Sequence, residues 1–255
     1  MIQLLNGEKH DIAEVLGHMK DDDYYYGFLG KNSLSSSAIK DLLDSPKTYH
    51  FRKENASKET QALRDGWLAH TCILEPEVFS AQEFVDVQSK NTKAFKEAKE
   101  NNPKVFTMKE KNDAERVADA FLRNEKALQY LQGAEFEVPI IGQVDGYPFR
   151  GKADILGPDY IADIKTTNDV KGFNYSASKY HYDVQCYLYC NLFDVHYSKF
   201  TFVIVDKGSL DIGIAHCSEE FYNRGQEKVQ RAISVYQTFF EDGVDIDSFY
   251  LEMTL

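Results

Sequence analysis

GKADILGPDYIADIKTT, residues 151–167, contains two short apolar stretches joined by a turn at residues 157–159. The first stretch carries Asp154, and the second carries Asp163 and Lys165. Two neighbouring strands joined so tightly bring both carboxylates to one sheet edge, with the lysine ammonium beside them. Paired carboxylates are hard oxygen ligands for Mg²⁺ or Mn²⁺, and a lysine beside a metal can hold or polarise the water that attacks a phosphodiester. These residues therefore predict a metal-dependent nuclease.

The acid-x-Lys pattern alone is close to chance, because it also occurs at residues 97–99 and 169–171. The first of these lies in a lysine-rich, helix-like run and the second lies past the expected strand end. Only Asp163 and Lys165 flank an isoleucine inside a β-like run. Alternate residues of a strand share a face, so these two side chains point the same way and Ile164 points into the core. Taken by themselves, the same residues also fit an ordinary surface ion pair.

Composition favours a folded protein without a membrane span. Of the 255 residues, 43% are hydrophobic and 13% are aromatic, which suits one large domain with a substantial core. No apolar run is long enough to span a membrane, and the N-terminus lacks the basic and apolar regions of a secretory signal. The four cysteines form no CxxC pair, which favours buried reduced thiols over a zinc or iron–sulfur site. We therefore expect a cytoplasmic protein.

The net charge of −12 argues at first against a nucleic-acid partner. The acidic excess is concentrated at the two ends, in residues 1–39 and 206–255, whereas residues 89–126 carry ten Lys and Arg against seven acids. An acidic exterior with a locally basic channel is compatible with an enzyme that grips DNA. The charge is therefore weak evidence in either direction.

The pattern of the chain predicts a polar, irregular lead-in over residues 1–32 and a single domain over residues 33–255. Within that domain, the lysine-rich residues 89–104 are expected to form an exposed loop or a mobile helix. The alternation of apolar residues and turn signals predicts the other elements. The first expected helix begins at Ser35 or Ser36 and ends before Pro46. The other expected helices cover about Gln61–Leu74, Met108–Tyr130, Lys179–Phe193 and Glu219–Phe240. The expected strands cover about Phe136–Val144, Tyr147–Leu156, Tyr160–Thr166, Lys199–Asp206 and Asp211–Cys217.

Further residues are placed to assist the proposed site. His70 lies on the helix before the strands, where a neutral imidazole could complete a metal site. Gln185 and Tyr189 are four residues apart and share a helix face. The Gln185 amide can bind phosphate, a ligand carboxylate or the attacking water. The Tyr189 phenol can hold Gln185 in place or contact DNA. Glu137 is a possible further metal ligand. The side chains expected to contact DNA phosphates are Arg150, Lys152, Thr166, Thr167, Lys171 and Lys179.

Each of these assignments has a plainer alternative. A single histidine on an amphipathic helix is more often structural than a ligand, and a half-buried tyrosine is ordinary in such a helix. Lysines on a solvated surface need no partner. The assignments gain weight from their occurrence together.

Taken as a set, these residues resemble the PD-(D/E)XK nuclease superfamily, and within it the RecB-type branch. In that branch a helix histidine, a strand aspartate, an Asp-x-Lys and a later Gln-x-x-x-Tyr occur in the same order as in this chain. The resemblance is strongest to the exodeoxyribonuclease VIII (RecE-type) domain of phages and prophages. It is carried by SLSSSAIKDLLDSPKTYHF, GWLAHTCILEPEVF, FRGKADIL, YIADIKTTNDVKGF and YHYDVQCYLY, between residues 33 and 190. The literal Pro-Asp dipeptide of the superfamily is replaced in this chain by Ala153-Asp154.

The resemblance implies an α/β (α+β) fold with a restriction-endonuclease-like core, in which helices flank a central mixed β-sheet. It also implies digestion of linear duplex DNA from the 5′ end, leaving 3′ single-stranded tails for a RecT-like annealing recombinase. Members of the family form homo-oligomeric rings around DNA. A phage or prophage protein acting in the cytoplasm of a bacterial host is the corresponding expectation.

The hypothesis for the chemistry assigns a role to each site residue. Asp154, Asp163, His70 and the backbone carbonyl of Ile164 would hold one or two Mg²⁺ ions, for which Mn²⁺ should substitute. Lys165 would orient the attacking water rather than act as a base, because its ordinary pKa of about 10.4 is far above neutrality. The alternatives are an endonuclease or single-strand nuclease of the same superfamily, and a catalytically silent DNA-binding module.

Overall fold

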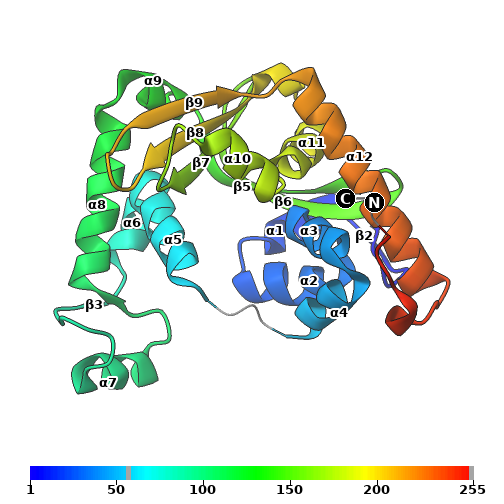
Figure 1. Cartoon of the computed structure of the whole chain (residues 1–255), viewed down its shortest axis with the longest axis horizontal. Coiled ribbons are helices and arrows are strands. Elements are labelled where there is room, and N and C mark those ends of the chain that lie inside the picture. The colour runs from blue at the N-terminus through cyan, green and yellow to red at the C-terminus, as the bar shows by residue number, and fades with distance from the viewer. Residues whose placement is uncertain (56–58, 253–255) are drawn as a thin grey trace.

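Helices and strands follow one another along the whole chain (Figure 1). The computed structural model describes residues 1–55 and 59–252. In chain order the elements are β1 (Ile2–Gln3), β2 (Lys9–His10), α1 (Ile12–His18), the π-helix η1 (Asp23–Phe28), α2 (Leu29–Asn32), α3 (Ser36–Asp44), α4 (Pro46–Glu54), α5 (Gln61–Leu74), α6 (Pro76–Ser80), β3 (Phe84–Val85), α7 (Lys93–Asn101), β4 (Phe106–Thr107), α8 (Met108–Arg123), α9 (Glu125–Leu128), the 3-10 helix η2 (Gln129–Leu131), β5 (Glu135–Val144), β6 (Tyr147–Leu156), β7 (Ile161–Thr167), α10 (Phe173–Lys179), α11 (Tyr182–Phe193), the 3-10 helix η3 (Tyr197–Lys199), β8 (Phe200–Asp206), β9 (Ile212–His216), α12 (Glu219–Tyr236), the π-helix η4 (Gln237–Glu241) and the 3-10 helix η5 (Ile246–Ser248).

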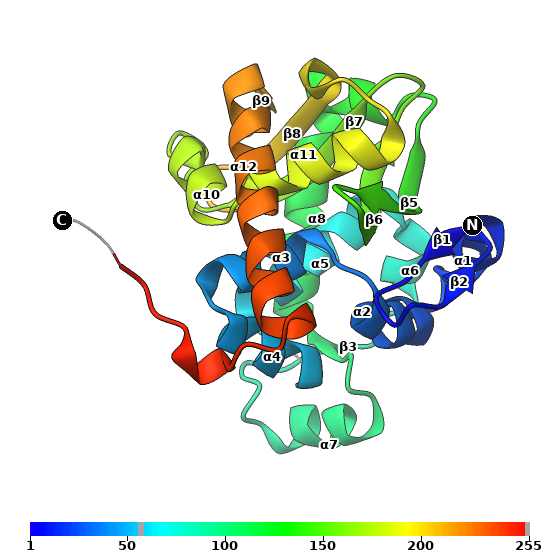
Figure 2. The same cartoon turned by 90° about the vertical axis from the view of Figure 1, so that its right-hand side faces the viewer.

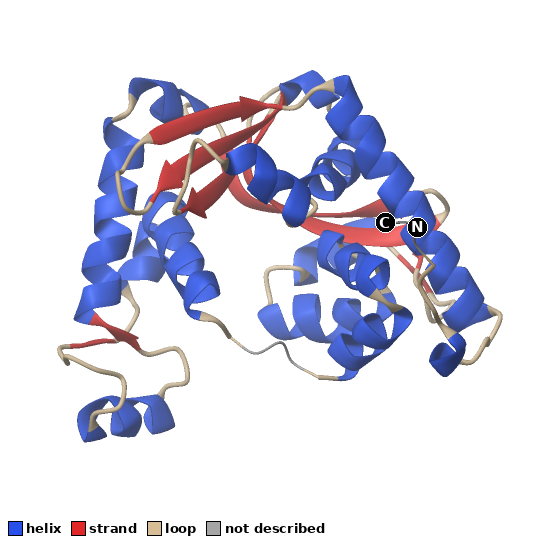
Figure 3. Cartoon of the chain, in the orientation of Figure 1, coloured by secondary structure: helices blue, strands red, loops and turns tan. Residues whose placement is uncertain are grey.

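A five-stranded mixed sheet lies between the helices, with the strands in the spatial order β5-β6-β7-β8-β9 (Figure 3). The strands β7 and β8 are parallel, and the other neighbouring pairs are antiparallel. The β5–β6 hairpin turns at Asp145 (φ 49°) and Gly146 (φ 84°), the two positive φ values that a two-residue type I′ turn requires. The predicted α/β class and mixed central sheet are therefore confirmed.

Helices cover both faces of the sheet (Figure 1). On one face, α5 and α8 pack through a cluster of side chains that includes Ala69, Phe121 and Ile164. On the other face, α3, α11 and α12 form a larger cluster around Phe200 and Phe202 of β8. The central strands are consequently buried on both sides, which explains why β8 is apolar along nearly its whole length.

The helix α5 spans the predicted residues Gln61–Leu74, and the Thr60 hydroxyl caps its first turn. It approaches β7 closely at Gly66, where an added Cβ would lie 3.8 Å from the Thr166 Oγ1 atom. This close approach places the next turn of α5, with His70, beside the sheet.

Residues 1–32 are not irregular, so that part of the predicted lead-in is wrong. They contain a small antiparallel pair, β1–β2, and the helices α1, η1 and α2. Their apolar side chains, such as Val15, Met19 and Leu29, form a buried cluster on Ile141 of β5. The tyrosine run expected to be irregular forms the π-helix η1. Figure 2 shows this segment beside the β5–β6 end of the sheet.

The predicted helix over residues 108–130 is divided in the structure, and two other predicted helices adjoin helices that were not predicted. Pro46 ends the first helix, as expected, but also begins α4 at once, with Ser45 capping both. Asn124 separates α8 from α9 within the predicted 108–130 helix. His181, in the left-handed conformation with φ 53°, separates α10 from α11 where one helix over 179–193 was predicted.

The lysine-rich segment 89–104 contains the short helix α7, which projects from the molecule below β3 and β4 (Figure 1). Phe95 is the buried residue of this helix. The predicted mobility of the segment stays a prediction, as does the domain boundary at residue 33. The predicted domain end at residue 255 lies outside the described residues. No helix among those described is long and apolar enough to cross a membrane.

Candidate active site

The site lies where β6 and β7 separate. The two strands pair only at Ile155↔Ala162 and Leu156↔Ile161. Asp154 and Asp163 are the next residues along each strand, so both carboxylates stand at this fork. The Ile164 N–H donates a hydrogen bond to Asp154 Oδ2 (2.8 Å) in place of a bond to the neighbouring strand. The tight connection predicted from the sequence does bring the two aspartates together.

His70, Glu137 and Asp154 form a cluster that can hold a metal ion. His70 Nδ1 lies 3.3 Å from Asp154 Oδ2, and one ligand atom from each of the three residues lies within 4.8 Å of the others. Glu137 stands opposite Asp154 in the β5–β6 register, with a left-handed backbone (φ 51°) that is costly for a residue with a side chain. Two carboxylates and an imidazole form a suitable donor set for Mg²⁺ or Mn²⁺.

Asp163 is buried beside this cluster, and both of its oxygens face other side chains of the site. The Gln185 amide donates a hydrogen bond to Asp163 Oδ2. The Lys165 ammonium forms an ion pair with Asp163 Oδ1, although that oxygen has no hydrogen-bond partner of good geometry among the described residues. The metal roles predicted for Asp163 and the Ile164 carbonyl stay predictions.

Burial and neighbouring carboxylates raise the pKa values of Glu137 and Asp154. Burial, and then the charge of Asp154, raises the pKa of Glu137 to about 8. Burial and the charge of Asp163 raise the pKa of Asp154 to about 6, although His70 and Lys165 act in the opposite direction. When these carboxyls are ionised, the metal-free site carries more negative charge than its own cations neutralise.

Lys165 remains protonated in this environment. Burial acts to lower its pKa, but the charges of Asp163 and Asp154 outweigh burial and hold it above its ordinary value. Its Nζ atom lies 4.8 Å from the centre of the Tyr182 ring and 5.8 Å from that of Phe202. Such a lysine can position water or phosphate but is a poor base at neutral pH.

Tyr189 braces the strand that carries Asp154. Its hydroxyl donates to the Lys152 carbonyl (3.0 Å) and accepts from the Lys152 N–H (3.2 Å). Its ring packs on Gly151, where an added Cβ would lie 2.8 Å from the ring. Of the two roles predicted for Tyr189, the structure thus supplies a brace, applied to strand β6 rather than to Gln185.

The six predicted phosphate contacts have different surroundings. Arg150 is engaged inside the protein: it donates to the carbonyls of Leu29 and Ser33 (3.0 Å each), and its guanidinium lies 5.2 Å from the Tyr25 ring centre. This geometry gives Arg150 a structural role that the sequence analysis missed. Lys152 lies 4.0 Å from Glu137 Oε2.

The remaining four residues lie farther along the chain from β6. Thr166 is half-buried against α5. Thr167 is half-buried, and its hydroxyl donates to the Asp169 carbonyl. Lys171 and Lys179 are exposed and form no ion pair among the described residues. Their predicted contacts with DNA stay predictions.

Sequence analysis also missed Lys40 and Tyr182. The Lys40 Nζ atom lies 5.5 Å from the centre of the Tyr182 ring, the ring on which Lys165 also rests. No local motif marks Lys40, because its position depends on how α3 packs against α11.

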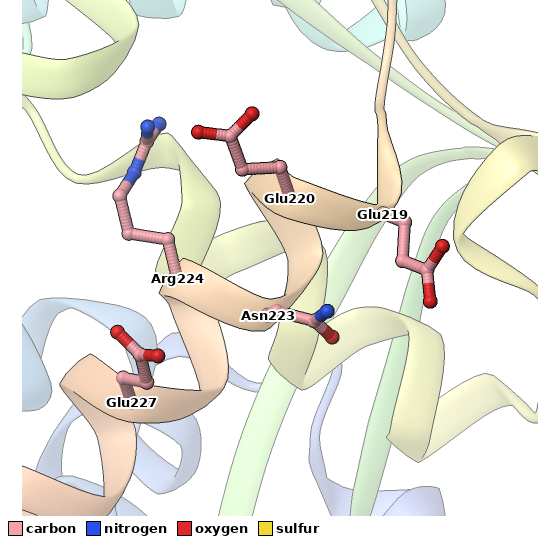
Figure 4. A pocket seen from close by; sticks show the side chains of 5 residues that line it. All are labelled: Glu219, Glu220, Asn223, Arg224 and Glu227. Atoms are coloured by element: carbon pink, nitrogen blue, oxygen red, sulfur yellow. The ribbon is translucent and has the colours of Figure 1, made fainter.

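A surface hollow of about 510 Å³ lies away from the fork, along a single helix face of α12 (Figure 4). It is lined by Glu219, Glu220, Asn223, Arg224 and Glu227, whose side chains project outward from that one helix. Its arginine, Arg224, pairs with the buried Asp183, and the possible metal cluster found among the described residues lies at the fork. The fork is therefore the candidate active site.

Comparisons with known proteins bear on the family and the fold. The model of a family described as a PDDEXK-like domain of unknown function (DUF3799) matches residues 35–245. A candidate exonuclease from Eubacterium rectale has a TM-score of 0.64 at 19% identity, over 92% of this chain and 95% of that one. A phage-related exonuclease from Haemophilus somnus 129PT has a TM-score of 0.38 at 15% identity, over 85% and 99%. No curated protein matches the sequence.

Proposed function

The chain belongs to the PDDEXK-like family matched at residues 35–245, and we propose that it is a metal-dependent exodeoxyribonuclease acting on linear duplex DNA. The family and the fold support a nuclease. The observation that carries the proposal is the fork itself, where His70, Asp154, Asp163 and Lys165 meet. The sequence resemblance to RecE-type enzymes is the reason for choosing an exonuclease.

A divalent cation fits the oxygen-rich donor set of His70, Glu137 and Asp154, and Mg²⁺ is our choice with Mn²⁺ as a substitute. When bound, such an ion supplies Lewis acidity and lowers the pKa of a water molecule. It would also offset the carboxylate charge that, together with burial, raises the pKa values of Glu137 and Asp154.

The remaining residues act by position. The Lys165 ammonium orients the attacking water and offsets charge on the phosphate, from a place fixed by Asp163. Gln185 holds the other oxygen of Asp163 and so keeps that carboxylate facing the fork. Tyr189 fixes the backbone of β6 two residues before Asp154, which limits the movement of the ligand relative to the phosphate.

The finer part of the proposal is that digestion runs from the 5′ end and leaves a 3′ tail for a RecT-like annealing protein. A homo-oligomeric ring around the duplex in the bacterial cytoplasm completes it. These features rest on the sequence resemblance alone. An endonuclease, a single-strand nuclease and a catalytically silent DNA-binding module are the rival functions, and each predicts a different product.

Digestion of linear duplex labelled at either the 5′ or the 3′ end separates these functions. The reaction is run with Mg²⁺ and with EDTA, beside a closed-circular duplex and a single-stranded oligonucleotide. The proposal predicts early loss of the 5′ label with Mg²⁺ only and an intact circle. Cleavage of the circle would indicate an endonuclease. Preferential cleavage of the oligonucleotide would indicate a single-strand nuclease. The absence of cleavage with any metal would indicate a catalytically silent DNA-binding module.

A further inference from the structure

A groove of about 330 Å³ lies next to the fork, between α3, α4 and the α10–α11 junction, and cationic side chains line it. Lys40 and Arg52 contribute from α3 and α4, and Lys179 and His181 from the junction. Figure 1 shows α10 in front of the central strands, with α3 below it. This groove has no part in the metal chemistry proposed above.

The acidic residues of the groove already have partners. Asp41 Oδ1 pairs with the Arg52 guanidinium at 2.8 Å. Asp44 Oδ2 accepts a hydrogen bond from the Thr48 hydroxyl at 2.6 Å. Neither carboxylate forms an ion pair with Lys40, which has none among the described residues, although the charges of Asp163, Asp183 and Asp41 act on it from a distance.

Lys40 is held in a place that is unfavourable for a cation. Its ammonium shares the Tyr182 ring with that of Lys165, at 5.5 Å and 4.8 Å from the ring centre. Burial, and then the charge of Lys165, lowers the pKa of Lys40 to about 8. A partly buried ammonium beside another one is costly unless an anion joins them. Across the groove, His181 Nδ1 is a buried ring nitrogen without a hydrogen-bond partner among the described residues, on a residue with φ 53°.

We propose that Lys40, with Lys179 and His181 across the groove, binds the backbone phosphate next to the scissile one. The inference rests on the proposed function and extends it, because it gives the DNA strand a path from Lys165 over Tyr182 into the groove. Two ammonium groups on one aromatic ring are close enough to take neighbouring phosphates of one strand. The contact is to phosphate and carries no sequence preference.

The test combines a variant with a modified substrate. Lys40→Met removes the charge and keeps most of the side-chain length, and Lys126→Met removes the charge of an exposed lysine on α9 as a matched control. The substrates are linear duplexes in which one of the two phosphates flanking the scissile bond is an uncharged methylphosphonate. Cleavage is measured under single-turnover conditions with Mg²⁺.

A charge-assisted contact predicts losses of about 10-fold each for Lys40→Met and for the methylphosphonate at one flanking position. Because both changes remove the same contact, their combination should also lose only about 10-fold. Lys126→Met should cleave like the wild type and keep the methylphosphonate effect. If Lys40→Met loses the product of the two factors on the methylphosphonate substrate, the two changes are independent and the proposal is wrong. Wild-type cleavage by Lys40→Met would also overturn it.

Two further readouts need no cleavage. DNA binding is measured in EDTA at several salt concentrations. The slope of log K against log salt concentration should be smaller in magnitude by about one unit for Lys40→Met than for the wild type, as expected for the loss of one phosphate contact. Its Tm without DNA should equal or exceed that of the wild type, whereas a lower Tm with an unchanged salt slope would show a structural lysine. If the wild type cleaves no DNA, the proposed function fails, and the salt slope still decides whether Lys40 binds phosphate.

Discussion

Two buried aspartates, Asp163 at the fork and Asp183 on α11, have opposite electrostatic surroundings. Their exposed fractions are 1% and 0%. Asp183 Oδ2 accepts from Arg224 Nε (2.6 Å) and Lys228 Nζ (2.7 Å), so two cations from α12 serve one carboxylate. At the fork, Asp163 pairs with Lys165, and Asp154 and Glu137 lie nearby, so three carboxylates face two lysines, Lys165 and Lys152, and a histidine.

The charge balance around Asp183 is that of a structural ion pair, whereas the charge balance at the fork suits the external cation that we propose. The contacts of Asp183 join α11 to α12 within the chain. When its carboxyls are ionised, the fork keeps a surplus of negative charge, which protons or an added cation can neutralise. Unequal charge balance, rather than burial, therefore distinguishes the functional carboxylates.

The largest expected effect is on cleavage at the fork. Lys165→Ala should lower the single-turnover rate by about a thousandfold or more, since it removes the group that positions water and phosphate. The variant should remain folded with some loss of Tm, because Asp163 loses its ion-pair partner, and the exposed Lys126→Ala is the matched control. Near-normal cleavage by Lys165→Ala would remove the lysine from the mechanism.

The corresponding change in the structural pair should act on stability instead. Asp183→Asn leaves Arg224 and Lys228 without their carboxylate, and should lower the free energy of unfolding by about 3 kcal/mol. Urea unfolding monitored by circular dichroism measures this loss. Below its melting temperature, the variant should cleave DNA at close to the wild-type rate. A stable variant with lost cleavage would reverse the assignment of the two aspartates.

The surplus charge should also make the metal-free protein sensitive to pH. The pKa values of Asp154 and Glu137 are raised to about 6 and about 8, so the folded state holds protons that the unfolded chain has released. Their contribution to stability therefore falls as the pH rises through these values.

Glu137→Gln removes most of this dependence. In EDTA at about pH 8.5, it should be more stable than the wild type by on the order of 1–2 kcal/mol, with a smaller difference at about pH 5. Thermal unfolding at the two pH values measures the effect, with the exposed Glu115→Gln as control. A gain that is equal at both pH values would show that repulsion between the carboxylates is not its cause.

A smaller effect is expected at the brace of β6. Tyr189→Phe loses the hydroxyl contacts to the Lys152 backbone, and should cost about 1–2 kcal/mol of stability. Cleavage should fall only a few-fold, because the metal cluster keeps its own contacts. Unfolding and single-turnover rates measured on one preparation test both statements. Complete loss of cleavage with normal stability would instead place Tyr189 in the chemistry.

The parts of the fold that follow from local chemistry could be predicted from sequence. The Asp145-Gly146 turn fixes the β5–β6 hairpin, and apolar spacing fixes the bounds of α5. Because His70, Asp154 and Asp163 lie on these regular elements, their approach could be predicted as well.

The parts that depend on distant packing could not be predicted. Glu137 joins the cluster through a left-handed backbone in the middle of β5, which no turn residue announces. Arg150 is used internally because residues 1–32 fold onto β5 and β6, whereas an irregular segment would have left it open. Lys40 reaches Tyr182 only through the packing of α3 against α11.

Direct measurement of metal binding is the sharpest test of the fork. Calorimetric titration with Mn²⁺ would compare the wild type, Asp154→Asn and the buried-carboxylate control Asp183→Asn. The account predicts binding by the wild type and by Asp183→Asn, and its loss in Asp154→Asn. Equal binding by Asp154→Asn and the wild type would contradict the assignment of the fork as the metal site.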